Sequence, residues 1–125
     1  MEFPNELAKK IFEISGQNVY SCMQCGKCSA GCPNVDFMDV TPNQVIHMIQ
    51  VGDENVLHVK TPWVCANCLT CTIRCPRDVD LAAIMEAIRH LSSLRAGIYR
   101  IDLNKVGKEG FPQIVLVAVA RKYTL

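Results

Sequence analysis

Apolar residues in the first 97 positions recur mainly every three or four residues, which is the spacing of one face of a helix. The segment 4–15 has this pattern, with Leu7, Ile11 and Ile14 on one face and Gly16 suited to ending a helix. The most regular segment begins at Asp80, a suitable N-cap, and reaches Gly97. Its apolar repeat is Leu81, Ile84, Met85, Ile88 and Leu91.

A third helix is predicted from Thr41, as N-cap, and Pro42, in the first turn, to Gly52. A shorter helix is predicted to begin at Asp53. Beyond Gly97 the pattern changes: residues 99–103 alternate, which favours a strand, and the tail is open between a helix started by Pro112 and a strand. The sequence therefore predicts a mainly α domain over 1–97 and an extension over 98–125.

The composition excludes several classes of protein. At 125 residues with a net charge of +1, nothing indicates nucleic acid or an acidic membrane surface. No signal peptide is visible, and the longest apolar run, Ile114 to Ala120, is far shorter than the roughly 20 residues of a membrane span. We expect a soluble protein of the reducing cytoplasm with no transmembrane segment and no nucleic-acid partner.

The eight cysteines form two copies of the run Cys-x2-Cys-x2-Cys-x3-Cys-Pro, with each cysteine repeated 43 residues later. The first copy has Cys22, Cys25, Cys28 and Cys32, and the second has Cys65, Cys68, Cys71 and Cys75. This spacing is typical of bacterial two-cluster iron–sulfur proteins, in which three close thiolates bind one cluster and the fourth binds the other. The predicted cofactors are two 4Fe–4S clusters, with these ligand sets: Cys22, Cys25, Cys28 and Cys75 for cluster 1, and Cys65, Cys68, Cys71 and Cys32 for cluster 2.

Other uses of the cysteines fit less well. Disulfides usually accompany secretion, structural zinc sites usually pair two separated Cys-x2-Cys hooks, and c-type haem needs a histidine after the second cysteine. The scattered His47, His58 and His90 are not needed as ligands. Trp63 is interpreted as a cluster shield or a core anchor, and Leu69 and Ile73 as covers of the same cluster.

The 33 residues from Cys32 to Cys65 carry helix signals rather than strand signals, which favours an α-helical ferredoxin architecture over the small strand-paired ferredoxins. Around residues 5–95 the chain resembles the C subunit of heterodisulfide reductase and its bacterial homologues. The resemblance rests on the first cysteine loop and on the segments 38–42, 51–53, 61–65 and 75–81. It implies an electron relay between a flavin-containing subunit and a disulfide-reducing catalytic subunit.

No catalytic site of its own is indicated, since the chain lacks the family's Cys-Cys-Gly motif and any G-x-G-x-x-G for a flavin or nicotinamide. The alternatives are an iron–sulfur subunit of a succinate- or fumarate-type quinone enzyme, a zinc-stabilised interaction module and a redox sensor. The quinone-enzyme subunits carry an additional plant-type cluster, for which no cysteines remain. The apolar tail is a candidate segment for docking a partner.

The duplicated motif predicts the metal content. Anaerobically purified protein should contain about eight iron and about eight sulfide per chain, because two cubanes are expected. Elemental analysis with a sulfide assay measures this. Stoichiometric zinc with little iron would instead identify a zinc-stabilised module.

Overall fold

The computed structural model describes residues 2–96, 110 and 112–123. The chain divides into two compact units, 1–92 and 93–125. No strand occurs in the part that is described. The helical elements are α1 (Glu6–Ser15), α2 (Lys27–Ala30), α3 (Pro42–Val51), α4 (Thr61–Val64), α5 (Thr70–Arg74), α6 (Leu81–Ala96) and α8 (Gln113–Tyr123), with 3-10 turns η1 (Val19–Ser21), η2 (Val35–Phe37) and η3 (Glu54–Leu57).

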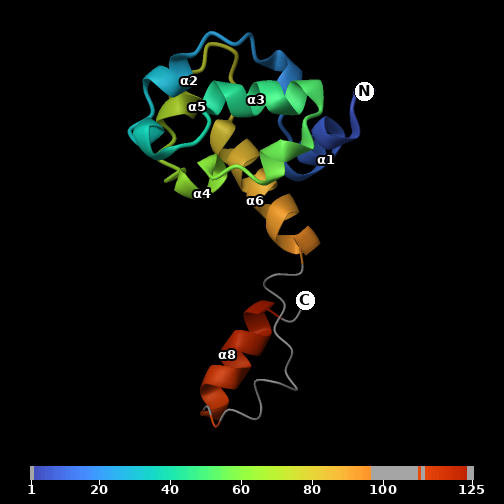
Figure 1. Ribbon diagram of the computed structural model, residues 1–125, viewed down its shortest axis with the longest axis vertical. Coiled ribbons are helices and arrows are strands. Elements are labelled where there is room, and N and C mark those ends of the chain that lie inside the picture. The colour runs from blue at the N-terminus through green and yellow to red at the C-terminus, as the bar shows by residue number, and fades with distance from the viewer. Residues whose placement is uncertain (1, 97–109, 111, 124–125) are drawn as a thin grey trace. The chain divides into compact units, whose positions relative to one another are not determined.

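The core of the first unit is formed mainly by the apolar faces of α1, α3 and α6 (Figure 1). The larger side chains with at most 1 % exposure on these helices are Ile11, Val45, Ile46, Ile49, Ile84, Met85 and Ile88. Burying such side chains stabilises the fold by roughly 1.5–3 kcal/mol each. The prediction of a mainly helical protein is therefore confirmed, with one local difference: Ile14 is 44 % exposed and lies outside the core.

The predicted helix starts are present. The Asp80 carboxylate accepts a hydrogen bond from the Ala83 amide at 3.1 Å, and the Thr41 amide donates to Gln44 Oε1 at 2.9 Å. In the tail, α8 is a helix, so the strand alternative for this segment is wrong. The strand expected over 99–103 lies outside the described residues. None of the helices within the described ranges is long and apolar enough to cross a membrane.

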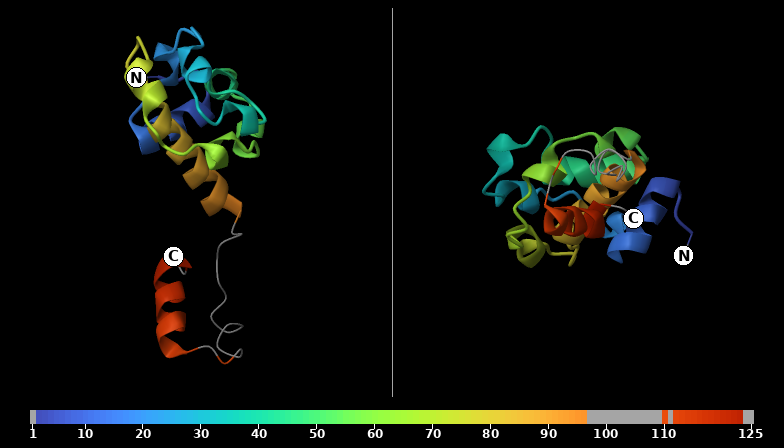
Figure 2. Two further views of the ribbon diagram at one scale, coloured as in Figure 1. Left: turned by 90° about the vertical axis from the view of Figure 1, so that its left-hand side faces the viewer. Right: turned by 90° about the horizontal axis from the view of Figure 1, so that it is seen from below.

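One side chain joins the start of α1 to the end of α3. Asn5 Oδ1 accepts from the Ala8 amide at 2.6 Å, while its Nδ2 donates to the carbonyls of Ile49 and Gln50, both at 3.1 Å. Gly52 makes this contact possible, because it ends α3 at a φ of 78° and a Cβ there would lie 3.3 Å from Asn5 Cβ. The start of α1 and the end of α3 are thus fixed to each other by polar contacts. Figure 2 shows the path of the chain from two further directions.

The loop before α3 is tied to the start of α4. Thr61 is fully buried, and its Oγ1 lies 2.6 Å from the Val40 carbonyl and 2.9 Å from Asp39 Oδ1. Asp39 also accepts from the Lys60 and Thr61 amides at 2.9 and 3.2 Å. These hydrogen bonds, led by the one from the Lys60 amide, hold the pKa of Asp39 below its usual range.

Replacing Thr61 by valine should destabilise the first unit. The change removes the hydroxyl of the fully buried Thr61 and leaves the part-buried Val40 carbonyl without its donor, at a cost of about 1–3 kcal/mol in the free energy of unfolding. Anaerobic chemical denaturation followed by circular dichroism measures the loss. Thr61→Ser is the control because it keeps the hydroxyl, and a Thr61→Ser variant no more stable than Thr61→Val would contradict the assigned role.

Candidate metal centre

Two short helices begin inside the cysteine runs and pack against each other. Cys28 lies in α2 and Cys71 in α5, and the two helices lie side by side (Figure 1). Cys28 is buried, whereas Cys25 and Cys68 are exposed; the other five cysteines are partly buried. The two cysteine loops, 43 residues apart in sequence, therefore meet in space.

One cavity brings together four of the predicted ligands. Its lining includes three cysteines of the second copy and one of the first, namely Cys65, Cys68, Cys71 and Cys32. Leu81, Ala82 and Met85 of α6 form part of its wall. A shell of apolar side chains around four sulfur donors is the environment of a buried iron–sulfur cluster, so the donor set fits the predicted group.

The other end of each cysteine run reaches across to the opposite loop. Asn34, two residues after Cys32, donates to the Val64 carbonyl at 3.1 Å. Arg77, two residues after Cys75, donates to the Ser21 carbonyl at 3.2 Å. Val64 and Ser21 each stand one residue before the first cysteine of a copy. The same crossed contact is therefore made twice, at equivalent positions of the repeat.

Backbone amides point at two of the sulfurs. The Gln24 amide lies 3.4 Å from Cys22 Sγ, and the Val79 amide lies 3.4 Å from Cys75 Sγ. Gln24 and its equivalent Asn67 both adopt a left-handed backbone, with φ of 57° and 53°. Such N–H donors stabilise a thiolate ligand and tune the potential of a cluster bound to it.

The thiols differ in how easily they ionise. Burial raises the pKa of Cys28, although hydrogen bonds with Ser29 oppose the shift, and burial likewise raises the pKa of Cys71. The Thr70 hydroxyl beside Cys68 lowers the pKa of that exposed thiol. Among the described residues, no three or more His, Cys, Asp or Glu side chains are placed to hold a single metal ion. This does not conflict with a 4Fe–4S cluster, because its four thiolate ligands each bind a different iron and need not converge on one point.

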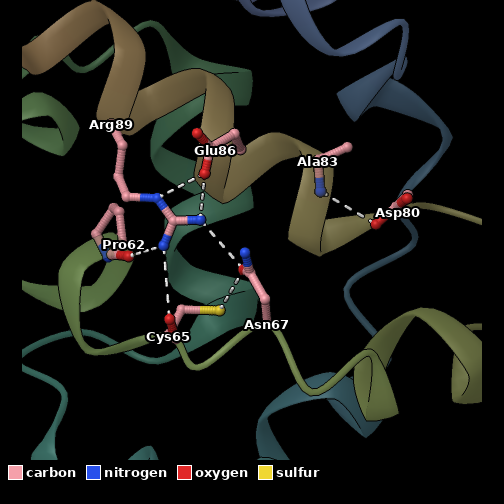
Figure 3. Close-up of polar contacts among 7 residues, drawn as sticks. All are labelled: Pro62, Cys65, Asn67, Asp80, Ala83, Glu86 and Arg89. Carbon is pink, nitrogen blue, oxygen red and sulfur yellow. Dashed lines mark hydrogen bonds and ion pairs between the residues drawn. The ribbon is translucent and has the colours of Figure 1, made fainter. Parts of the chain in front are cut away.

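Long polar side chains on the core helices hold each loop. Gln50, the penultimate residue of α3, donates to the carbonyls of Val19 and Cys22 at 2.8 and 3.3 Å. Arg89, in the middle of α6, donates to the carbonyls of Pro62 and Cys65 at 2.7 and 3.5 Å (Figure 3). Neither residue was predicted from the sequence. Val19 and Pro62 are separated by the same 43 residues as the paired cysteines, so the repeat could have identified their carbonyls as equivalent. It could not have identified the side chains that donate to them.

Several predicted site residues lie elsewhere. Trp63 is 52 % exposed and does not line the cavity, so it is not a core anchor. Leu69 does line the cavity, but Ile73 is 82 % exposed and does not. The two histidines His47 and His58 are exposed, as is His90. The apolar wall of the cavity thus combines Leu69 of the loop with Leu81, Ala82 and Met85 of α6.

A family profile described as a 4Fe-4S dicluster domain matches residues 16–79, which include all eight cysteines. The chain belongs to this 4Fe-4S dicluster family. Two 4Fe–4S clusters are accordingly its cofactors, as the duplicated motif predicts. The ligands available for them are the eight cysteines of the two loops.

This dicluster chain is similar to C subunits of heterodisulfide reductases from methanogens. It is 35 % identical over 71 residues, 57 % of this chain and 29 % of the relative, to the C subunit of the ferredoxin:CoB-CoM heterodisulfide reductase of Methanosarcina acetivorans. It is 32 % identical over 100 residues, 77 % of this chain and 54 % of the relative, to the C2 subunit of the H(2)/formate:CoB-CoM heterodisulfide,ferredoxin reductase of Methanococcus maripaludis. In a third relative, the C subunit of the ferredoxin:CoB-CoM heterodisulfide reductase of Methanosarcina mazei, the identity is 29 % over 99 residues, 79 % of this chain and 61 % of the relative.

The aligned part spans from 29 % to 61 % of the length of these relatives. The resemblance to the C subunits stated from the sequence is thus confirmed for the cluster-binding region.

Proposed function

We propose that this dicluster chain is the electron-transfer subunit of a cytoplasmic heterodisulfide-reductase-like complex. It relays electrons between a flavin-containing subunit and a disulfide-reducing catalytic subunit. The observation that carries this proposal is the duplicated motif of eight cysteines inside a 4Fe-4S dicluster domain that is similar to the C subunits. No cysteine is left over for an additional plant-type cluster, which disfavours the quinone-enzyme alternative.

The ligand sets are part of the proposal. Cluster 2 is bound by Cys65, Cys68, Cys71 and Cys32, which is supported by the cavity that all four line. Cluster 1 is bound by Cys22, Cys25, Cys28 and Cys75, which is supported by the contact between Arg77, just after Cys75, and the Ser21 carbonyl, just before Cys22. Each cluster then links two distant parts of the chain.

An electron relay needs its two clusters close together. Cys28 belongs to the proposed ligands of cluster 1 and Cys71 to those of cluster 2, and the helices that carry them, α2 and α5, pack against each other. Clusters bound by these ligand sets would therefore lie next to each other. The bound clusters supply the one-electron chemistry, and the chain supplies their separation and surroundings.

Replacing Cys75 by alanine should damage cluster 1 rather than the cluster beside it in sequence. Replacing Cys32 by alanine should mirror this and damage cluster 2, because the fourth ligand of each cluster comes from the other copy. Electron paramagnetic resonance of the reduced, anaerobic variants identifies which signal is lost.

The two alanine variants are each other's control, since both remove the cysteine before a proline. If Cys75→Ala removed the cluster on Cys65, Cys68 and Cys71, each copy would bind its own cluster and the crossed sets would be wrong.

The isolated chain should take up electrons from a strong reductant and return them to an artificial dye, without reducing a heterodisulfide. Disulfide reduction should begin only when flavin-containing and catalytic subunits are added, because the chain offers no site for that chemistry. Anaerobic stopped-flow absorbance and a thiol assay measure the two steps. Heterodisulfide reduction by the chain alone would overturn the relay.

The extension 98–125 is proposed as the docking segment for one of these partners. Its helix α8 presents large apolar side chains to solvent, among them Ile114 and Val117, exposed by 78 % and 67 %. Exposed apolar side chains gathered on one short helix are typical of an interaction surface. Removal of residues 111–125 should weaken complex formation when the flavin-containing and catalytic subunits are added, while leaving the iron content of the chain unchanged.

A further inference from the structure

The two cysteine loops are tethered to the core at equivalent points by different side chains. Gln50 Nε2 donates to the carbonyl three residues before Cys22 and to that of Cys22 itself. Arg89 Nη1 donates to the carbonyl three residues before Cys65 and to that of Cys65 itself (Figure 3). Each loop is therefore held through two backbone oxygens, and these oxygens stand at equivalent positions in the two loops.

Each tether also reaches a sulfur through one intermediate residue. Gln24 Nε2 lies 3.4 Å from Gln50 Oε1 and 3.7 Å from Cys22 Sγ. At the equivalent position of the second loop, Asn67 Oδ1 lies 3.1 Å from Arg89 Nη2 and 3.5 Å from Cys65 Sγ. In both loops, one residue therefore lies between the side chain from the core helix and the sulfur of the first cysteine.

The tethers differ in charge. Gln50 is neutral, whereas Arg89 places a guanidinium against the Cys65 carbonyl and against Asn67 Oδ1, which itself lies 3.5 Å from Cys65 Sγ. The Arg89 side chain is only 15 % exposed, and its carboxylate partner Glu86, at 2.6 Å, is 67 % exposed. Water screens the exposed carboxylate more than the partly buried guanidinium, so the carboxylate does not fully cancel the positive charge that acts on the second loop.

We propose that Arg89 is a positioning residue that holds the second cysteine loop and raises the reduction potential of the cluster bound there. Reduction adds one electron to a cluster, and a nearby cation stabilises the more negative product. The neutral Gln50 supplies the corresponding hydrogen bonds to the first loop with no such effect. This inference rests on the proposed function, since it uses the ligand sets assigned there.

Arg77 provides a matched comparison. It too is an arginine that donates to a loop carbonyl, from Nε to Ser21 at 3.2 Å, next to Cys22. It is exposed, however, so its charge is screened by solvent and salt. The same substitution at the two arginines therefore separates a partly buried charge from an exposed one.

The test is an anaerobic redox titration of the full-length, cluster-loaded chain, followed by electron paramagnetic resonance. Arg89→Gln should lower one of the two midpoint potentials by about 59 mV, which corresponds to about a tenfold change in the one-electron equilibrium constant. Glu86→Gln should raise the same midpoint by less, and Arg89→Lys, which keeps the charge, should stay near wild type. Arg77→Gln should leave both midpoints near wild type, including that of the cluster on the first loop, beside which Arg77 lies.

Iron and sulfide are measured in the same samples. A purely structural role of Arg89 would reduce the cluster content, but it would not make Arg89→Gln lower the midpoint potential and Glu86→Gln raise it. Unchanged midpoints in both Arg89→Gln and Glu86→Gln, with full cluster content, would overturn the inference and leave the proposed function standing. If Arg89→Gln fails to hold its cluster, Glu86→Gln decides alone: a raised midpoint supports the inference and an unchanged one refutes it. A wild-type chain without two clusters would instead overturn the proposed function.

Discussion

The hydrogen bonds that hold the two cysteine loops against the helical core govern the rest of this molecule. A loop with backbone carbonyls near the interior needs donors, since an unpaired buried carbonyl costs about 1–3 kcal/mol. Gln50 and Arg89 supply those donors from α3 and α6, the same helices that form the apolar core. The positions of the sulfurs are thus coupled to the packing of the helices.

The remaining polar contacts serve the same arrangement at its other points. Asn5 fixes the end of α3, from which Gln50 projects, and Asp39 with Thr61 fixes the start of α4, which leads into the second loop. Asn34 and Arg77 then join each loop to the chain that follows the opposite copy. Every buried polar side-chain atom in the described part of the chain has a hydrogen-bond partner. Such complete satisfaction favours one rigid geometry for the cysteines.

The repeat is symmetric in its cysteines and asymmetric around them. The two loops present carbonyls at equivalent positions, and each has a left-handed residue at the equivalent position, Gln24 or Asn67. The side chains that donate to the carbonyls come from different helices and differ in charge. Two clusters bound by identical motifs are therefore placed in unequal electrostatic surroundings. For a relay this inequality matters, because the difference in potential between neighbouring clusters decides on which of them an electron resides.

Much of this protein was predictable from the sequence because the signals are local. The cysteine spacing identified the cofactors, and caps such as Asp80 and Thr41 identified the helix starts, since both depend on residues a few positions apart. The helical state of 113–123 was not predictable, because its β-branched residues and its Pro112 favour opposite states. Arg89 and Gln50 were hidden for a different reason: each contacts a loop 24 to 31 residues away. Only the packing of α3 and α6 decides which loop a long side chain reaches, so the tethers and their charges belong to the tertiary structure.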